Sequence, residues 1–245
     1  PWIHELAFDQ INVDLIAGMV GETWESWRQT VQKTIDLNPD SVTVYQMELP
    51  YNTVYSKDLL SGDSGSLSLA DWETKRAWHA YAFEEFAAAG FTLSSAYTMK
   101  KTPEARFVYR DAVWTGQDMI GAGVASFSLI SGVHYQTAPR WEDYLDIVNA
   151  GELPLHRAFA TTREEQLTRE TILQLKLGTL SADYFRAKFD VDIVQHFKKA
   201  LNGLREEGLL RIDADAIALT PEGLLRVDQL LPDFYDCLLY TSDAA

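Results

Sequence analysis

A strand, a tight turn and a capped helix near the start of this chain limit what it can fold into. Residues 11–17 alternate apolar and polar side chains and lead into Gly18. Thr23 is a suitable N-cap residue, and residues 24–35 place apolar side chains at helical spacing. Asn38-Pro39-Asp40 ends that helix, and residues 41–47 have the pattern of a second strand. A helix between two strands about 30 residues apart predicts a parallel βαβ unit.

Further elements follow at intervals along the chain. Ser68 and Asp71 have capping-box spacing, which predicts a helix to about Ala89. We expect strands at residues 91–97 and, less regularly, at the glycine-punctuated residues 119–130.

The pattern changes from about residue 139. Helices are predicted at Trp141–Asn149 and over 190–207. A capping box of Thr162 and Glu165 begins another helix that ends at about Leu177, and a short helix begins at Ser181. Residues 209–219 predict a hairpin, and Thr220-Pro221 opens a last helix. Helices, a hairpin and a closing helix together indicate a winged-helix-like module.

Composition excludes several classes of function. The 245 residues carry a formal net charge of −15, which argues against non-specific binding to nucleic acid or anionic membranes. We find no apolar run near the roughly 18 residues that span a bilayer, so no membrane span is predicted. The single cysteine, Cys237, excludes an internal disulfide framework and is consistent with the cytoplasm. The five histidines lack metal-ligand spacing, so no metal site is predicted.

The two ends of the sequence do not look natural. The chain has no initiator Met, and Pro1 begins close to a strand. Residues 237–245 break the preceding pattern, as an artefactual tail would. We therefore expect the chain to be a fragment.

Asn12 and Asp14 are the first candidate functional residues, because they share one face of the opening strand. In parallel β/α structures the carboxyl ends of the strands hold the ligand site, so an inward Asp14 must pair with a ligand or a donor. An edge strand whose polar face meets water is the alternative. The spacing leaves both interpretations open.

Two further segments are candidate ligand contacts. Met47 and Glu48 follow the second strand at the same rim, although a lone Glu48 is typical of a solvated carboxylate. Gly121, Gly123 and Phe127 lie in a segment that either approaches a ligand closely or packs tightly. It lacks the third glycine of a dinucleotide-binding fingerprint.

Four cations cluster in an otherwise acidic chain. They are Lys100, Lys101, Arg106 and Arg110. Such a group can bind the carboxylates of an anionic substrate, or can be ordinary surface charge.

Several motifs in order resemble one enzyme family. They are Asn12-Val13-Asp14-Leu15-Ile16-x-Gly18, Glu22-Thr23-Trp24-Glu25-Ser26-Trp27, Leu37-Asn38-Pro39-Asp40, Tyr45-Gln46, Trp114-x-Gly116-x-Asp118-x-Ile120-Gly121-x-Gly123, Gly151-x-x-Pro154, Glu207-Gly208-Leu209-Leu210 and Leu219-Thr220-Pro221-x-Gly223. Their order and spacing over about 10–235 resemble the oxygen-independent coproporphyrinogen III oxidases, which are radical S-adenosylmethionine enzymes. Val20 and the segment 48–53 depart from the family pattern.

The resemblance implies an α/β fold: the later part of a partial (β/α) barrel over 1–135 and a helical, winged-helix-like C-terminal domain over 136–236. It implies S-adenosylmethionine and a [4Fe-4S] cluster as cofactors. The cysteine ligands of the cluster are missing here, so the fragment alone should be inactive. By position, Asp14 and Phe127 match residues that contact S-adenosylmethionine in the family. Either Met47 or Glu48 aligns with another such residue.

The implied activity is the oxidative decarboxylation of tetrapyrrole propionates in haem biosynthesis. A haem chaperone or a haem-degrading relative is the alternative, and the electron donor is not identified. The four cations are then candidates for binding the substrate carboxylates. A winged-helix regulator is disfavoured because the last module is acidic.

Overall fold

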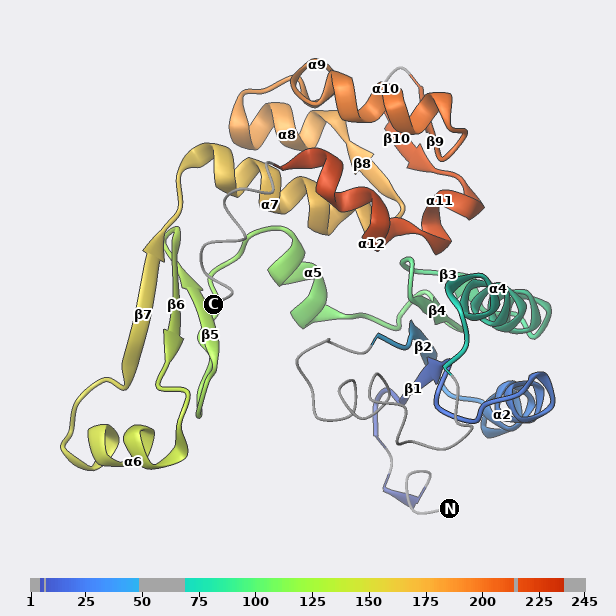
Figure 1. Cartoon of the computed structure of the whole chain (residues 1–245), viewed down its shortest axis with the longest axis horizontal. Helices are drawn as coiled ribbons and strands as arrows, with labels where there is room; N and C mark the ends of the chain where they lie inside the picture. Colours follow the sequence, from blue (N-terminus) through green and yellow to red (C-terminus); the bar gives the residue numbers. More distant parts are fainter. Residues whose placement is uncertain (1–4, 7, 49–68, 214–215, 236–245) are drawn as a thin grey trace. The chain divides into compact units, whose positions relative to one another are not determined.

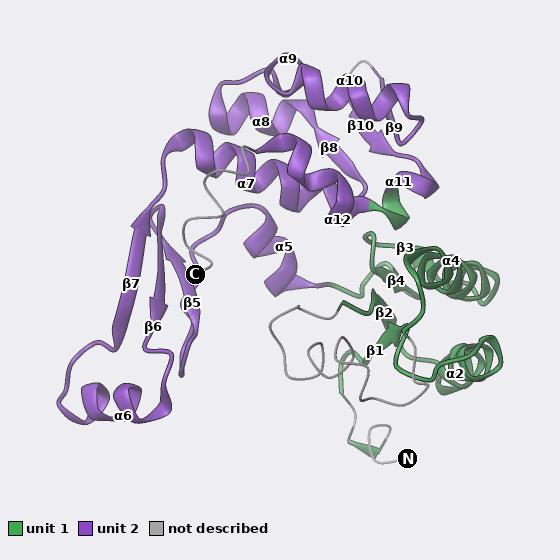
Figure 2. Ribbon diagram, viewed as in Figure 1, with its two compact units in different colours: residues 1–106, 224–226 green, residues 107–223, 227–245 purple. Residues whose placement is uncertain are grey.

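The computed structural model describes residues 5–6, 8–48, 69–213 and 216–235 (Figure 1). It forms two compact units, 1–106 with 224–226 and 107–223 with 227–245 (Figure 2). The boundary expected between residues 135 and 136 falls within strand β6, Val133–Thr137. A barrel part ending at 135 and a separate domain over 136–236 stay a prediction. The tail at 237–245 and Cys237 lie outside the described residues.

Unit 1 contains the predicted parallel βαβ unit. Its elements are β1 (Asn12–Ala17), α2 (Trp24–Leu37) and β2 (Ser41–Gln46), and the two strands pair in parallel along their whole length. Thr23 and Ser26 form a capping box at the start of α2. Asn38, with φ of 52°, ends the helix in the left-handed conformation. The prediction from sequence is confirmed here.

The next part of unit 1 differs from expectation. Helix α4 (Trp72–Ala88) begins with Asp71 as its N-cap, and Ser68 lies outside the described residues. The strand expected at 91–97 is wrong in extent, because β3 (Thr92–Leu93) is followed by a turn and by β4 (Thr98–Lys100). Strand β4 runs antiparallel to both β2 and β3, so the sheet order is β1-β2-β4-β3.

The two faces of this sheet have different roles. Helices α2 and α4 pack on one face, where they bury the apolar side chains of the strands (Figure 1). This core contains Leu15, Ala17, Trp27, Val31, Val42, Val44, Trp78, Ala82, Phe86, Phe91 and Met99. The opposite face carries the alternate residues of β1, namely Asn12, Asp14 and Ile16, and all three are exposed.

One part of unit 2 is a three-stranded antiparallel sheet. It contains β5 (Phe127–Ile130), β6 (Val133–Thr137) and β7 (Leu155–Ala160), with α6 (Trp141–Asn149) between the last two. Helix α6 has the predicted bounds, but strands β6 and β7 were not predicted. Only 127–130 of the expected segment 119–130 forms a named strand. Helix α6 has no buried residue, and every residue of β7 is exposed.

The remainder of unit 2 surrounds a second three-stranded sheet, β8-β10-β9. Its helices are α5 (Val108–Trp114), α7 (Arg163–Leu175), α8 (Ala182–Phe189), α9 (Ile193–His196) and α10 (Lys198–Glu206). Its strands are β8 (Thr179–Ser181), β9 (Leu210–Ile212) and β10 (Ala216–Leu219). Three short elements follow, α11 (Pro221–Leu225), α12 (Val227–Leu230) and the 3-10 helix η1 (Leu231–Phe234), and the residues 224–226 group with unit 1.

Two of these helices begin at the capping residues that the sequence predicted. Thr162 and Glu165 form the capping box of α7, and Ser181 caps α8. The hairpin at 209–219 is confirmed by β9 and β10. The single helix expected over 190–207 is instead divided at Phe197 into α9 and α10. Within the described ranges, no helix is long and apolar enough to cross a membrane.

Candidate functional site

Asp14 lies on the face of the unit 1 sheet opposite α2 and α4. Asn12 Nδ2 donates a hydrogen bond to Asp14 Oδ1 at 2.7 Å, and Ser41 Oγ donates to Asn12 Oδ1 at 2.8 Å. Within the described ranges no donor reaches Asp14 Oδ2. The carboxylate is therefore oriented by its neighbours and keeps one oxygen available to a ligand.

Apolar and aromatic side chains border this carboxylate. Ile16 pairs directly with Tyr45 across the two strands, and the side chains are 43% and 45% exposed. The Tyr45 ring stacks on Tyr97 with ring centroids 6.1 Å apart. Burial, followed by the negative charge of Asp14, raises the pKa of Tyr45. This surface suits an organic ligand that has both an apolar part and a cationic or hydroxylated part.

The backbone at the end of β2 is held from two sides. Met47 N donates to Ala17 O at 2.8 Å, and Met47 O accepts from Lys75 Nζ at 2.8 Å. Met47 is half-buried and Glu48 is exposed. Sequence reasoning missed Lys75, although its spacing from Trp78 places it on the buried face of α4.

A second carboxylate orders the loop between β1 and α2. Glu22 Oε2 accepts hydrogen bonds from Gly18 N at 2.6 Å and Met19 N at 3.2 Å. Burial raises the pKa of Glu22, although these two hydrogen bonds oppose the shift. Glu22 was also missed, because its role depends on the fold of a loop rather than on spacing.

Close packing accounts for part of the need for glycine in the segment around Gly121 and Gly123 of unit 2. A side chain at Gly121 would collide with the backbone of Phe127, and Gly121 N donates to Ser128 Oγ at 2.9 Å. Gly123 has φ of +105° and accepts from Thr137 Oγ1 at 2.6 Å. The Phe127 ring stacks on His134 at 5.3 Å and stays 45% exposed, so it remains available to a ligand.

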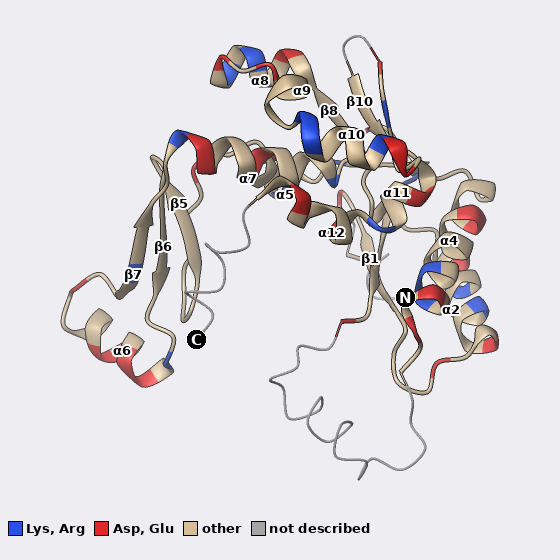
Figure 3. Cartoon of the chain, turned by 45° about the horizontal axis from the view of Figure 1, so that its top comes forward, with Lys and Arg blue, Asp and Glu red and all other residues tan. Residues whose placement is uncertain are grey.

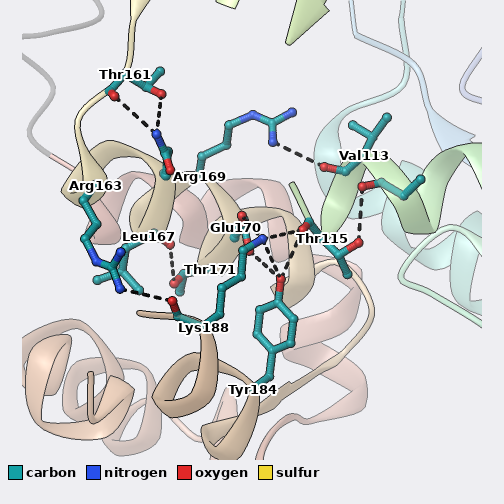
Figure 4. A network of polar contacts seen from close by, with 12 residues as sticks. Val113, Thr115, Thr161, Arg163, Leu167, Arg169, Glu170, Thr171, Tyr184 and Lys188 are labelled. Carbon is teal, nitrogen blue, oxygen red and sulfur yellow. Dashed lines mark hydrogen bonds and ion pairs between the residues drawn. The ribbon is translucent and has the colours of Figure 1, made fainter. Parts of the chain in front are cut away.

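An ion pair between a buried carboxylate and a partly exposed ammonium group fixes the end of α5 in unit 2 (Figure 4). Glu170 of α7 is 2.7 Å from Lys188 Nζ of α8, and it accepts from the Tyr184 hydroxyl at 2.5 Å. Lys188 Nζ also donates to Thr115 O, the C-cap carbonyl of α5, at 2.7 Å. Burial and the hydrogen bond to Glu170 raise the pKa of Tyr184. A side chain at Gly116, where φ is +66°, would collide with Glu170.

Three of the four predicted cations have partners of their own: Lys100 Nζ donates to Pro103 O, Lys101 bonds Asn38 and Arg110 bonds Asp111. Lys100 pairs with Ser41 at the start of β2, and Lys101 Nζ bonds Asn38 Oδ1, so both lie at the opposite end of the sheet from Met47. Arg106 is exposed. In unit 2, Arg110 forms an ion pair with Asp111 at 2.7 Å. Acidic and basic residues both occur along α2, α4 and α10, whereas the charged residues of α6 are all acidic (Figure 3).

A site for an iron–sulfur cluster is not found in the described part of the chain. No group of three or more His, Cys, Asp or Glu side chains there could hold a metal ion. The single cysteine of the sequence lies outside the described residues. We therefore assign none of the described residues to a cluster.

The fold matches that of a radical S-adenosylmethionine enzyme. A structure described as "Coproporphyrinogen III oxidase (HemN) from Escherichia coli is a Radical SAM enzyme" superposes with a TM-score of 0.75. The match covers 94% of this chain and 56% of that chain, at 21% sequence identity. At this identity the match concerns the fold alone, a mixed α/β fold.

The sequence points to the same relatives. Residues 161–226 match the family model described as the HemN C-terminal domain. Oxygen-independent coproporphyrinogen III oxidases of Synechocystis sp. and Helicobacter pylori strain J99 are 25% and 28% identical, over 95% and 94% of this chain and 53% of each relative. The heme chaperone HemW of Bacillus subtilis is 22% identical over 94% of this chain and 60% of its own length.

These comparisons confirm the resemblance predicted from the sequence. The chain resembles oxygen-independent coproporphyrinogen III oxidases and, among related proteins, a heme chaperone. It spans about half the length of most of these relatives.

Proposed function

We propose that this chain is part of a radical S-adenosylmethionine oxidoreductase that decarboxylates the propionates of a tetrapyrrole. The observation that carries the proposal is Asp14, an oriented carboxylate on the sheet face opposite the helices, in a chain most of whose reported relatives are coproporphyrinogen oxidases. Met47 and Glu48 follow the neighbouring parallel strand, and Gly121, Gly123 and Phe127 are the further cofactor contacts that we propose.

The residues around Asp14 suit S-adenosylmethionine. That cofactor carries an ammonium group, a sulfonium centre and ribose hydroxyls, all of which an exposed carboxylate oxygen can bind. Ile16 and Tyr45 offer an apolar surface to its adenine ring. When bound, S-adenosylmethionine supplies hydrogen-atom abstraction. Within the chain, Asp14 would bind and orient the cofactor, and Met47 and Glu48 would line the rim beside it.

The same proposal interprets unit 1 as part of a (β/α) barrel. The parallel β1-α2-β2 unit with both helices on one face supports this interpretation, and the antiparallel strand β4 departs from it. Helices α7 to α10 followed by the β9–β10 hairpin support a winged-helix-like C-terminal domain. The roles of Lys100, Lys101, Arg106 and Arg110 in binding substrate carboxylates remain predictions, as do a cytoplasmic location and the inactivity of this chain alone.

A haem chaperone is the second candidate function, favoured by the match to the Bacillus subtilis heme chaperone. The test uses the full-length protein, purified without oxygen. Loss of carbon dioxide from coproporphyrinogen III in the presence of S-adenosylmethionine would support the oxidase. Stoichiometric haem binding without decarboxylation would support the chaperone. If the protein neither releases carbon dioxide nor binds haem, both candidate functions are contradicted.

We predict that Asp14→Ala in the full-length protein weakens S-adenosylmethionine binding by about tenfold, because a hydrogen-bonded charged partner is lost. Equilibrium dialysis with labelled cofactor measures the change. Asp36→Ala is the matched control, since Asp36 is an exposed carboxylate on α2 that bonds Gln32 at 2.9 Å. Equal affinities of the wild type and Asp14→Ala would remove Asp14 from the cofactor site.

A further inference from the structure

Lys75 is an unusual residue for the buried face of a helix. It is 6% exposed and lies on the face of α4 that also carries Trp78 and Ala82. Lysine is almost never buried this completely unless its charge is paired. In the described part of the chain, however, no carboxylate lies within ion-pair distance of Lys75.

The ammonium group instead contacts the end of β2. Lys75 Nζ donates to Met47 O at 2.8 Å and lies 4.4 Å from the centre of the Trp72 ring. Because Met47 N donates to Ala17 O, both backbone polar groups of Met47 are fixed. This anchor sets where Met47 and the adjacent Glu48 leave the strand.

Gly18 leaves the room that the lysine stem needs. A Cβ at Gly18 would lie 2.9 Å from Lys75 Cγ and 3.1 Å from Cδ and Cε. Gly18 also has φ of +98°, which side-chain-bearing residues rarely adopt. Glu22 holds the same loop through the Gly18 and Met19 amides. Three segments of unit 1 are thus arranged around one lysine side chain.

Stability alone does not explain this arrangement. Burial lowers the pKa of Lys75, and the negative charges of Glu48 and Asp71 only partly offset the shift. Burying an unpaired charge costs free energy, so replacing it with an apolar group of similar volume should be neutral or stabilising. An apolar side chain of similar length would still cover the core, so the hydrogen bond to Met47 O is the contact that specifically requires the ammonium group.

We propose that Lys75 is a positioning residue that fixes the end of β2, and through it Met47 and Glu48, for S-adenosylmethionine binding. The inference rests on the proposed function. It also gives a reason for the glycine of the Asn12–Gly18 motif, because the path of the Lys75 side chain passes over Gly18. Lys75 does not itself need to touch the cofactor.

The test compares Lys75→Met with the wild type in the full-length protein. We expect the dissociation constant for S-adenosylmethionine to rise by roughly tenfold, because the rim residues lose their fixed positions. The melting temperature should stay within about 2 °C or rise, as expected for an apolar replacement of a buried charge. Lys33→Met on the exposed side of α2 is the matched control and should change neither quantity.

Each outcome has a distinct meaning. Failure of the wild type to bind S-adenosylmethionine would overturn the proposed function and this inference with it. A wild type that binds, together with a folded Lys75→Met of equal affinity, would overturn only the positioning role. If Lys75→Met does not fold, Lys75→Gln is used in its place, because a glutamine side chain is too short to reach Met47 O. We expect the same rise in the dissociation constant for S-adenosylmethionine, and an unchanged constant would overturn the positioning role.

Discussion

Lys188→Met is expected to lower the free energy of unfolding by about 3 kcal/mol, because it leaves a buried carboxylate without its cation. The side chain of Glu170 is only 4% exposed, so water cannot replace the lost partner. Thr115 O at the end of α5 would lose a donor at the same time. The Tyr184 hydroxyl would remain as a donor to Glu170 Oε2.

Urea unfolding followed by circular dichroism measures this loss. The double variant Glu170→Gln with Lys188→Met should recover most of the stability, since the uncompensated charge is gone while Tyr184 keeps an acceptor. Lys199→Met, at an exposed position of α10, is the matched control. A loss below about 1 kcal/mol would place the pair among ordinary surface ion pairs.

Acidification between pH 6.5 and 4 should destabilise the protein through His79 by about 3 kcal/mol. His79 is 1% exposed, and burial lowers its pKa from 6.5 to about 4. The unfolded chain therefore binds a proton in this range that the folded chain does not. Stability from this residue is present above pH 6.5 and is lost as the pH falls toward 4.

The surroundings of His79 offer little to stabilise a charged ring. Its Nδ1 lies 2.9 Å from Gln46 Nε2, its Nε2 has no partner among the described residues, and the ring packs edge-on against Phe83. Unfolding free energies at several pH values should show a shallower acid loss in His79→Gln than in the wild type. His156→Gln, an exposed position in β7, should keep the wild-type slope. Parallel slopes for the wild type and His79→Gln would contradict the assignment.

Local signals in the sequence predicted much of the fold. Thr23, Thr162 and Ser181 each cap a helix where their side chains can accept backbone hydrogen bonds. The parallel pairing of β1 with β2 followed from the length of the connection. These features depend on neighbouring residues, so spacing and residue type suffice to find them.

Features that depend on distant residues were not predicted. The direction of β4 is set by the turn around Ser95, whose side chain and backbone bond Tyr97 and Thr98. Helix α6 lies between strands β6 and β7 in the sequence, so the pairing of these strands joins residues separated by a whole helix. Propensity does not report such pairings.

The candidate site shows the same division. Asp14 was placed on the correct strand by alternation, and its contact with a cofactor stays a prediction. Lys75 and Glu170 were missed, because a charged residue at a helical position is normally read as exposed. Lys100 and Lys101 are close in sequence to Arg110, yet they bond Pro103 and Asn38 while Arg110 bonds Asp111.

The exposed helix α6 has a practical consequence. None of its residues is buried, and the turn that follows it at Gly151 has open space around it. Exposed turns of this kind are preferred sites for tolerated insertions. A short epitope or a fluorophore-binding peptide introduced between Ala150 and Gly151 would therefore give a handle for labelling or immobilising the protein at a position away from the hydrophobic core of unit 1.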